Sequence, residues 1–288
     1  MAWKNPWYDS SKAHHTPEGF CSPEPEQRQP GDLQRWRRER KAQGLPHPPQ
    51  QGYAAFTDQW WQPADIRGSD DRIWWLGHAA VLLRLNEQYI LIDPALGSRA
   101  SPFSFAGPQR KTPAPLSIAD LPRLDVVLIS HNHYDHLDRT TVKAIVRRFP
   151  QATFIVPLGL AKWCRARGVK QVHQLDWWQQ TAVNGLCFDA VPARHWSMRT
   201  LRDRNRSLWC GWVVRSASVR FWFSGDSGYS DSLLDIPGRL GPFNLAALPI
   251  GAYAPEWFMA SQHMNPDQAV ALWQAAGRPL TLPIDRKS

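Results

Sequence analysis

Three imidazoles and one carboxylate occur within six consecutive residues, His131-Asn-His-Tyr-Asp-His136. Imidazole nitrogen and carboxylate oxygen are ligands that suit zinc in proteins. The motif directly follows an apolar run that predicts a buried strand. Alternation along that strand puts His131 and His133 on one side, where both can reach one ion. Asp135 and the last histidine of the motif, in the turn that follows, can reach a second ion. A solvated polar loop is the alternative interpretation.

Two further polar residues stand at the ends of predicted strands. His195 follows an apolar run at 185–192, and Asp226 follows a run at 219–224 in a turn flanked by glycines. Taken alone, each is more often an ordinary loop residue. After the first motif, their order and their positions at strand ends favour ligation of the same metal centre.

The elements that must position these residues are short strands interleaved with amphipathic helices. Strands are predicted at 73–76, 79–85, 89–92, 124–130, 153–156, 171–175, 185–192, 208–214, 219–224 and 245–249. Helices are predicted at 140–149, 160–167 and 266–276. The Pro- and Ser-rich stretch from 95 to 116 is predicted to be a long functional loop. Two strand-rich halves with helices outside predict an α/β sandwich of two sheets covered by helices.

The first 50 residues differ from the rest because they are rich in proline and charge. This composition predicts an N-terminal arm, residues 1–50, that lies over a single domain of residues 51–288. The histidines of this arm are expected to be solvated: His14, His15 and His47.

The composition limits which class of protein this chain can belong to and which partners it is expected to bind. With 43% hydrophobic and 20% charged residues, the chain is expected to be globular. A net charge of +9 favours anionic partners such as phospholipid headgroups, although a generic solvated surface is the alternative. No RNA-recognition motif or helix-turn-helix pattern is present, so we expect no nucleic acid partner. Four scattered cysteines, no long apolar run and no secretory signal predict a cytoplasmic protein.

The order of the motifs, HxHxDH followed by a lone His and by Ser-Gly-Asp, resembles the metallo-β-lactamase superfamily. Further segments resemble one branch, the N-acylphosphatidylethanolamine-hydrolysing phospholipase D and its bacterial RomA-type relatives. The segments that carry this resemblance are Trp75–Ala79, Asp93-Pro94, Ser98–Pro102, Leu128–Asp138, Pro157–Leu160, Leu175–Trp178, Gly241–Ala247, Pro249–Tyr253 and Gln262-His263. The resemblance runs from about residue 45 to residue 278 and implies an αββα sandwich of two mixed sheets.

The resemblance also implies a pair of zinc ions. The first would be held by His131, His133 and His195, with Asp226 as the bridge. The second would be held by Asp135, His136 and Asp226. His78 is expected to pack beneath the metal loop rather than to bind metal.

The implied reaction is phosphodiester hydrolysis of N-acyl phospholipids by a zinc-bound hydroxide, which yields phosphatidic acid and an N-acylethanolamine. The residues expected to contact substrate are Tyr134, His263, Gln262 and Asp93. Asp135 and His263 are expected to be catalytic. Peripheral contact with an anionic membrane is expected as well, and a homodimer is one assembly that the sequence leaves open.

The C-terminal segment departs from the family pattern. The family continues past the region of Gly277 with a strand that ends in His-Trp-Gly-Thr-Phe, and this His completes the second zinc site. Residues 278–288 here read Arg-Pro-Leu-Thr-Leu-Pro-Ile-Asp-Arg-Lys-Ser and contain no His. We therefore expect a chain that lacks the family's C-terminal segment, with a weakened second zinc site and reduced activity.

Two alternative functions remain. The same fold could hydrolyse another ester or phosphodiester, such as a lactone or a cyclic phosphate. A low-activity relative could instead bind anionic membrane through a basic, Trp-rich surface. The motifs around Tyr134 and His263 favour the N-acyl phospholipid substrate.

Overall fold

Two mixed six-stranded sheets form the centre of the molecule in the computed structural model, which describes residues 3–24, 29–45 and 47–285. The first sheet has the order β3-β4-β5-β6-β7-β8, with bounds Arg72–Trp75, Val81–Leu85, Gln88–Ile92, Val126–Leu128, Thr153–Pro157 and Gln171–Leu175. The second has the order β14-β13-β12-β11-β10-β9, with bounds Leu280–Ile284, Leu245–Pro249, Arg220–Phe223, Gly211–Arg215, Leu186–Val191 and Gln180–Val183. Strands β5 to β8 and β12 to β14 pair in parallel, and the other pairs are antiparallel.

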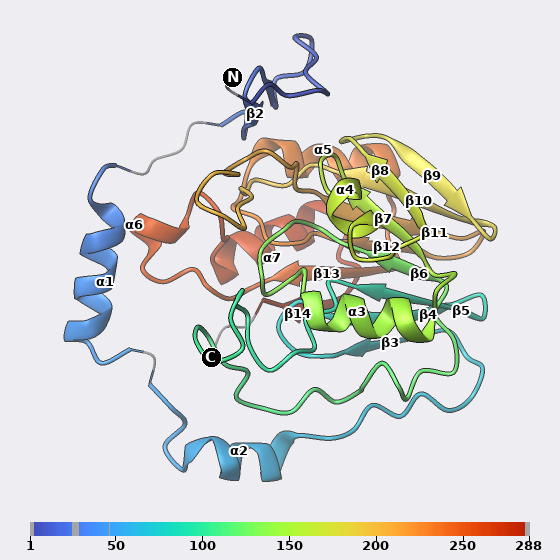
Figure 1. The fold of residues 1–288 in the computed structure, drawn as a ribbon, viewed down its shortest axis with the longest axis horizontal. Coiled ribbons are helices and arrows are strands. Elements are labelled where there is room, and N and C mark those ends of the chain that lie inside the picture. The colour runs from blue at the N-terminus through green and yellow to red at the C-terminus, as the bar shows by residue number, and fades with distance from the viewer. Residues whose placement is uncertain (1–2, 25–28, 46, 286–288) are drawn as a thin grey trace.

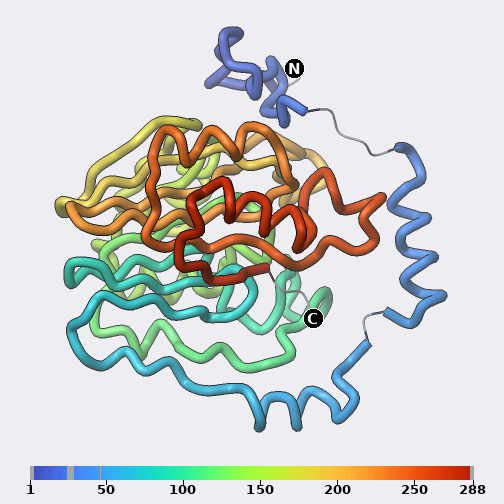
Figure 2. Tube along the Cα trace, turned by 180° about the vertical axis from the view of Figure 1, so that it is seen from behind, coloured from blue at the N-terminus to red at the C-terminus, as the bar shows by residue number. Residues whose placement is uncertain are grey.

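Helices cover both outer faces of the sheet pair. Their bounds are α3 Arg139–Arg148, α4 Ala161–Arg165, α5 Asp231–Leu240, α6 Glu256–Met259 and α7 Pro266–Ala275. The two opposite views show α3 over one sheet and α7 over the other (Figures 1 and 2). The αββα sandwich that the sequence predicted is therefore confirmed.

Three apolar clusters hold these layers together. Leu83 of β4 and Phe223 of β12 belong to the cluster between the sheets. Ile145 of α3 belongs to the cluster outside the first sheet, and Leu272 of α7 to the cluster outside the second. All four side chains are buried, and full burial of such a side chain stabilises the fold by about 1.5–3 kcal/mol.

The predicted strands and helices form at the expected places with shifts of a few residues at their ends. Strand β14 is a correction, because we expected the chain to lack the family's closing strand. Leu280 pairs in parallel with Leu245, and the pairing continues to Ile284 opposite Pro249. β14 is the edge strand of its sheet, where Pro283, which has no backbone N–H to donate, is tolerated.

The predicted arm, called here the N-terminal segment, is more ordered than its composition suggested. It forms β1 His15–Thr16, β2 Gly19–Phe20 and α1 Asp32–Ala42, and α2 Gly52–Trp60 follows it. The prediction that His14 and His15 are solvated is wrong, because both side chains are buried and Phe20 joins the cluster between the sheets. His47 is exposed, as predicted.

Helices α1 and α2 lie outside the sandwich and bury none of their residues (Figure 1). Trp36 of α1 stacks on Phe258 of α6 with 5.3 Å between the ring centroids. The predicted boundary between an arm of residues 1–50 and a domain of residues 51–288 stays a prediction. Residues 1–2, 25–28, 46 and 286–288 of these two parts lie outside the described residues. Within the described segments, no helix is long and apolar enough to cross a membrane.

Candidate metal centre

The chemistry-bearing side chains meet at one edge of the sandwich. They follow the ends of β5, β6, β10, β12 and β14, and in that order they are Asp93, His131, His195, Asp226 and Asp285. The strands paired in parallel end at the same edge, and β10 ends at Val191 opposite the start of β11. The fold thus brings together residues from two halves of the chain.

A close histidine cluster follows β6 and β10. The Nε2 atom of His131 lies 2.8 Å from Nδ1 of His133, and Nε2 of His195 lies 3.3 Å from the same Nδ1 atom. Two nitrogens bound at about 2.0–2.1 Å to one tetrahedral zinc ion are separated by about 3.3 Å. The three nitrogens therefore converge as ligands of one ion would.

In His195 and His136, the Nδ1 atom on the far side of the ring from the cluster has a hydrogen-bond acceptor beside it. Nδ1 of His195 lies 3.1 Å from the backbone oxygen of Gln262, and Nδ1 of His136 lies 2.8 Å from the carboxylate of Asp93. Both partners accept, so Nδ1 carries the proton in each ring. In His195 the lone pair of Nε2 is left to face the cluster, which is the arrangement that metal ligation requires.

Asp93 also orients the first histidine of the motif. Its carboxylate accepts hydrogen bonds from the backbone N–H and the hydroxyl of Ser130, at 2.6 and 2.5 Å. Because the hydroxyl gives its hydrogen to Asp93, it can only accept from Nδ1 of His131, which lies 2.9 Å away. A single buried carboxylate therefore sets the tautomers of His131 and His136.

Asp226 stands between the two groups of expected ligands. Its Oδ2 atom lies 3.1 Å from Nε2 of His136 and 3.9 Å from Nε2 of His195. Its Oδ1 atom is buried and has no hydrogen-bond partner. Gly225, with a φ of 65°, makes the left-handed turn that precedes Asp226, and it lies so close to Ser130 that a side chain would crowd it. An unsatisfied carboxylate oxygen in a buried place is costly unless a cation compensates it, so the donor set fits a bound metal.

Burial and charge favour the ligating forms of these groups. Burial, together with the neighbouring imidazoles, lowers the pKa of His131 well below its usual value. Burial likewise lowers the pKa of His195. Burial opposes ionisation of Asp226, but His136 and the nearby His263 hold its pKa well below the usual range. His131 and His195 are thus neutral imidazoles and Asp226 is an ionised carboxylate near neutral pH. Burial opposes protonation of His136, but Asp226 and Asp93 raise its pKa well above the usual value.

His78 lies beside two acidic residues at this edge, and its expected role of packing beneath the metal loop stays a prediction. Its Nε2 atom lies 3.2 Å from Asp135, and its Nδ1 atom lies 3.3 Å from Asp285. His78, Asp93 and Asp285 have φ values of 53°, 44° and 55°, in the left-handed region that non-glycine residues rarely adopt. Such strained residues cluster at functional sites, so these angles support the assignment of this edge as the site.

Tyr134, expected to contact substrate, is half-buried beside an arginine that the sequence did not reveal. The Tyr134 hydroxyl donates to the backbone oxygen of Arg199 at 2.9 Å, and the Arg199 guanidinium lies 4.0 Å from the centre of the Tyr134 ring. Arg199 also donates to the backbone oxygens of Asn132 and Leu137, and burial lowers its pKa to about 10. Arg199 therefore holds the backbone in place near both ends of the metal-binding motif.

The other expected substrate contacts are more deeply placed. The Gln262 side chain is buried and donates to the backbone oxygen of Phe258, so it is turned toward α6. His263 is buried with its Nδ1 atom 2.9 Å from Asp285. The exposed fraction of Asp93 is 0%, and its carboxylate bonds Ser130 and His136. This geometry favours a positioning role for Asp93 in place of the substrate contact that we expected.

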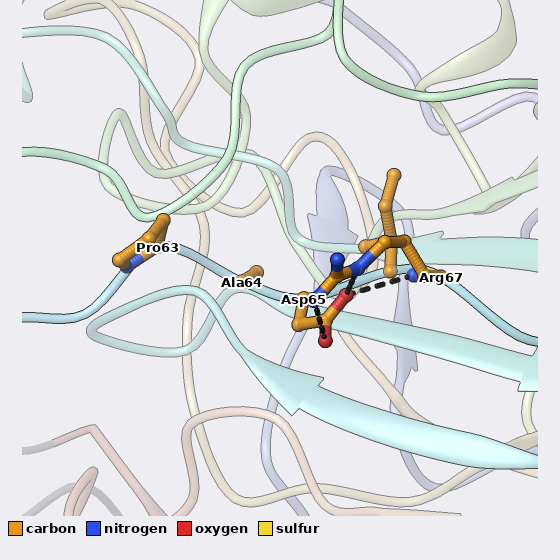
Figure 3. Close-up of a pocket in the computed structure, with 5 residues that line it drawn as sticks. Pro63, Ala64, Asp65 and Arg67 are labelled. Atoms are coloured by element: carbon orange, nitrogen blue, oxygen red, sulfur yellow. Dashed lines mark hydrogen bonds and ion pairs between the residues drawn. The ribbon is translucent and has the colours of Figure 1, made fainter.

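A shallow hollow elsewhere on the surface is lined by residues 63–67 (Figure 3). Inside it, the Arg67 guanidinium donates to the Asp65 carboxylate at 2.8 Å. None of the metal-centre residues lines this hollow, so it is separate from the candidate site.

Comparison with protein families gives one domain match. Residues 88–284 match the family described as "Beta-lactamase superfamily domain". This range contains every expected metal ligand, from the motif after β6 to Asp226 after β12.

The chain is also similar to two curated proteins and to a solved structure. It is 46% identical over 206 residues to N-acyl-phosphatidylethanolamine-hydrolyzing phospholipase D 1 of Caenorhabditis elegans, a match that covers 68% of this chain and 58% of that protein. It is 36% identical over 205 residues to the mitochondrial enzyme of that name from Saccharomyces cerevisiae, covering 69% and 43%. Igni18, a metallo hydrolase of Ignicoccus hospitalis, shares the fold with a TM-score of 0.57 and 20% identity, covering 75% of this chain and 82% of that one. The matched region thus spans about half the length of the curated relatives.

Proposed function

Because the chain belongs to the beta-lactamase superfamily, we propose that it is a metal-dependent hydrolase with a two-metal centre that cleaves the phosphodiester bond of N-acyl phospholipids. The observation that carries this proposal is the convergence of His131, His133 and His195 on one point. Their ligating nitrogens face each other at 2.8 and 3.3 Å. The unsatisfied oxygen of Asp226 supports the same conclusion from the other side of the cluster.

The ligands divide into two sets. His131, His133 and His195 would hold the first ion, which we take to be zinc because three imidazoles suit it. Asp135 and His136 would hold the second, and Asp226 would contact both ions because it stands between the two sets. When bound, such a pair would activate water at neutral pH and stabilise negative charge on phosphoryl oxygens.

The chain's own residues prepare the centre for this chemistry. Asp93 holds the tautomers of two ligating histidines, and Arg199 fixes the motif at its two ends. Tyr134, held by Arg199 at the rim, is the proposed contact for the phospholipid headgroup. His263 is the proposed proton-transfer group, since Asp285 accepts from its Nδ1 atom and leaves Nε2 for the reaction.

Similarity to the nematode and yeast phospholipases supports the substrate class. On this proposal the products are phosphatidic acid and an N-acylethanolamine. A net charge of +9 supports peripheral contact with an anionic membrane, where the substrate lies.

The test is hydrolysis of N-acylated phosphatidylethanolamine in mixed micelles by the purified chain, with metal content measured on the same sample. The expected result is release of N-acylethanolamine that disappears with His133→Ala. His173→Ala is the matched control, because His173 is an exposed histidine on β8. Hydrolysis of a lactone or a cyclic phosphate without phospholipid cleavage would replace the substrate proposal with the alternative hydrolase. Metal-free, inactive wild-type protein would overturn the proposal altogether.

A further inference from the structure

Asp285 completes the ring of polar residues around the centre, at the end of the strand that we did not predict. It directly follows Ile284, whose partner on β13 is Pro249. Its backbone N–H donates to the backbone oxygen of His78 at 3.1 Å, which fixes the strand end against the β3–β4 connection. The exposed fraction of Asp285 is 0%.

The two oxygens of the Asp285 carboxylate differ in their hydrogen bonding. Oδ2 accepts a hydrogen bond from Nδ1 of His263 at 2.9 Å. Oδ1 is buried without a hydrogen-bond partner, although Nδ1 of His78 lies 3.3 Å away. A buried carboxylate with one unsatisfied oxygen loses hydration that no hydrogen bond to that oxygen replaces. A cation beside Oδ1 would compensate that loss.

A second unsatisfied carboxylate oxygen lies in the same place. Potential ligand atoms of Asp226, His263 and Asp285 all lie within 4.8 Å of one another, and all three residues are buried. Asp226 Oδ1 has no hydrogen-bond partner either. Asp226 in turn contacts His136, which is assigned to the second ion. Both unsatisfied carboxylates thus adjoin the second of the two metal positions.

We propose that Asp285 is a ligand of the second ion, and that its carboxylate shifts that position toward hard cations such as Mn²⁺. The proposal rests on the two-metal function proposed above. The second position would then hold three carboxylates and one imidazole, from Asp135, Asp226, Asp285 and His136. Carboxylate oxygen suits Mn²⁺, whereas imidazole suits Zn²⁺. The two positions of one centre therefore differ in their preferred metal.

His263 has a clear part in this arrangement. A carboxylate ligand commonly receives a hydrogen bond on its second oxygen, which fixes its orientation. The His263 bond to Oδ2 leaves Oδ1 to face the ion. If Asp285 served only to orient His263, its replacement by Asn would keep an acceptor for that bond and leave the metal content unchanged.

The experiment measures metal content and metal preference, independently of activity. Wild-type protein, Asp285→Asn, Asp285→His and His263→Ala are stripped of metal and then equilibrated with defined mixtures of Zn²⁺ and Mn²⁺. Bound metal is counted by elemental analysis, and bound Mn²⁺ is titrated by electron paramagnetic resonance. Circular dichroism of the metal-free proteins checks that each variant folds.

We expect Asp285→Asn to weaken the second ion more than about 100-fold, beyond the 10–100-fold typical of residues that only support a ligand. His263→Ala should stay within that smaller range. Asp285→His should retain two ions and shift the Mn²⁺/Zn²⁺ ratio at the second position at least about 10-fold toward zinc.

The outcomes separate the two proposals. Two tightly held ions in Asp285→Asn, or an unchanged metal ratio in Asp285→His, would overturn the role of Asp285 and leave the proposed function standing. Equal weakening by Asp285→Asn and His263→Ala would also overturn it, because it would mean that Asp285 acts through His263. Wild-type protein that binds neither metal would overturn the proposed function itself. If Asp285→Asn fails to fold, Asp285→His still decides the question through the metal ratio.

Discussion

In the part of the chain that the structure describes, two regions gather histidine and aspartate side chains, and they differ in how well they suit a metal ion. The first joins His131, His133 and His195 beside Asp226. The second joins His14 and His15 of the N-terminal segment to Asp176, which follows β8. Both clusters bring imidazole and carboxylate groups close together, and their side chains are buried except for His133, which is half-buried.

Hydrogen bonding distinguishes them. The Asp176 carboxylate is saturated: Oδ1 accepts from Nε2 of His14 at 2.7 Å and from the backbone N–H of Trp177 at 2.8 Å. Oδ2 accepts from the Lys12 ammonium at 2.5 Å, with Nε2 of His15 at 3.0 Å. Around Asp226, in contrast, one oxygen has no hydrogen-bond partner.

The two clusters also differ in which ring nitrogen of the histidine carries the proton. Nδ1 of His15 accepts the backbone N–H of Asp9 at 3.2 Å, so the proton of the neutral ring is on Nε2, which lies 3.0 Å from Asp176. In His131 and His195 of the metal centre, the proton is on Nδ1 and the Nε2 lone pair faces inward. The partner of the far ring nitrogen, more than the presence of histidine, decides whether a cluster can bind metal.

The largest expected effect comes from removing one imidazole from each cluster. His131→Ala should lose the first ion and reduce phospholipid hydrolysis by more than about 100-fold, because a ligand is lost and not only its support. His14→Ala should keep its full metal content, since Asp176 is already neutralised by Lys12. Elemental analysis of the two variants checks this. Loss of metal from His14→Ala would show that the N-terminal cluster also binds an ion.

Asp93→Asn tests whether the partner of the far nitrogen controls ligation. Asp93 lies behind the histidines, yet its replacement should weaken metal binding by about 10–100-fold, because Asn can present an N–H where His131 and His136 need an acceptor. Asp189→Asn is the matched control, since Asp189 pairs with Arg215 at 2.7 Å on another part of the second sheet. Metal affinities are read by competition with a chromogenic chelator. Equal affinity in Asp93→Asn and Asp189→Asn would contradict the tautomer argument.

The sequence predicted the metal motif and the sandwich because their signals are local. Three histidines within six residues, and strands of apolar residues with period two, can be recognised without knowing what lies opposite. His195 and Asp226 needed only their position at strand ends. These local features were enough to predict most of the candidate site and most of the fold.

The remaining features depend on distant partners. His14 and Asp176 are 162 positions apart, so a Pro-rich, charged segment gave no sign that its histidines are buried. Asp285 resembles any aspartate after a short apolar run, and only the pairing of β14 with β13 brings it to the centre. Arg199 acts through backbone oxygens of the metal motif, a contact that leaves no residue pattern.

The smallest expected effect is on stability, because the second cluster holds the N-terminal segment against the sandwich. Burial opposes ionisation of Asp176, but hydrogen bonds from His14 and Lys12 hold its pKa well below the usual range. Asp176→Asn should therefore reduce the free energy of unfolding by about 1–3 kcal/mol, the cost of leaving buried donors without their acceptor. Metal content should not change, in contrast to the metal-centre variants.

The pH dependence of this loss follows from the sign of the pKa shift. A carboxyl whose pKa is lower in the folded state stabilises the fold above its unfolded pKa, about 3.9, and loses that contribution as the pH falls toward the folded value. The stability difference between wild type and Asp176→Asn should thus be full between pH 5 and 7, which are about 1–3 units above the unfolded pKa, and should shrink below about pH 4. Thermal unfolding across this range, with proteolysis of residues 3–24 as a local probe, measures it. A difference that stayed constant into acid, or that grew there, would mean that Asp176 does not fasten the segment through its charge. The two clusters would then differ in metal binding alone, and Phe20, buried between the sheets, would be left to hold the N-terminal segment in place.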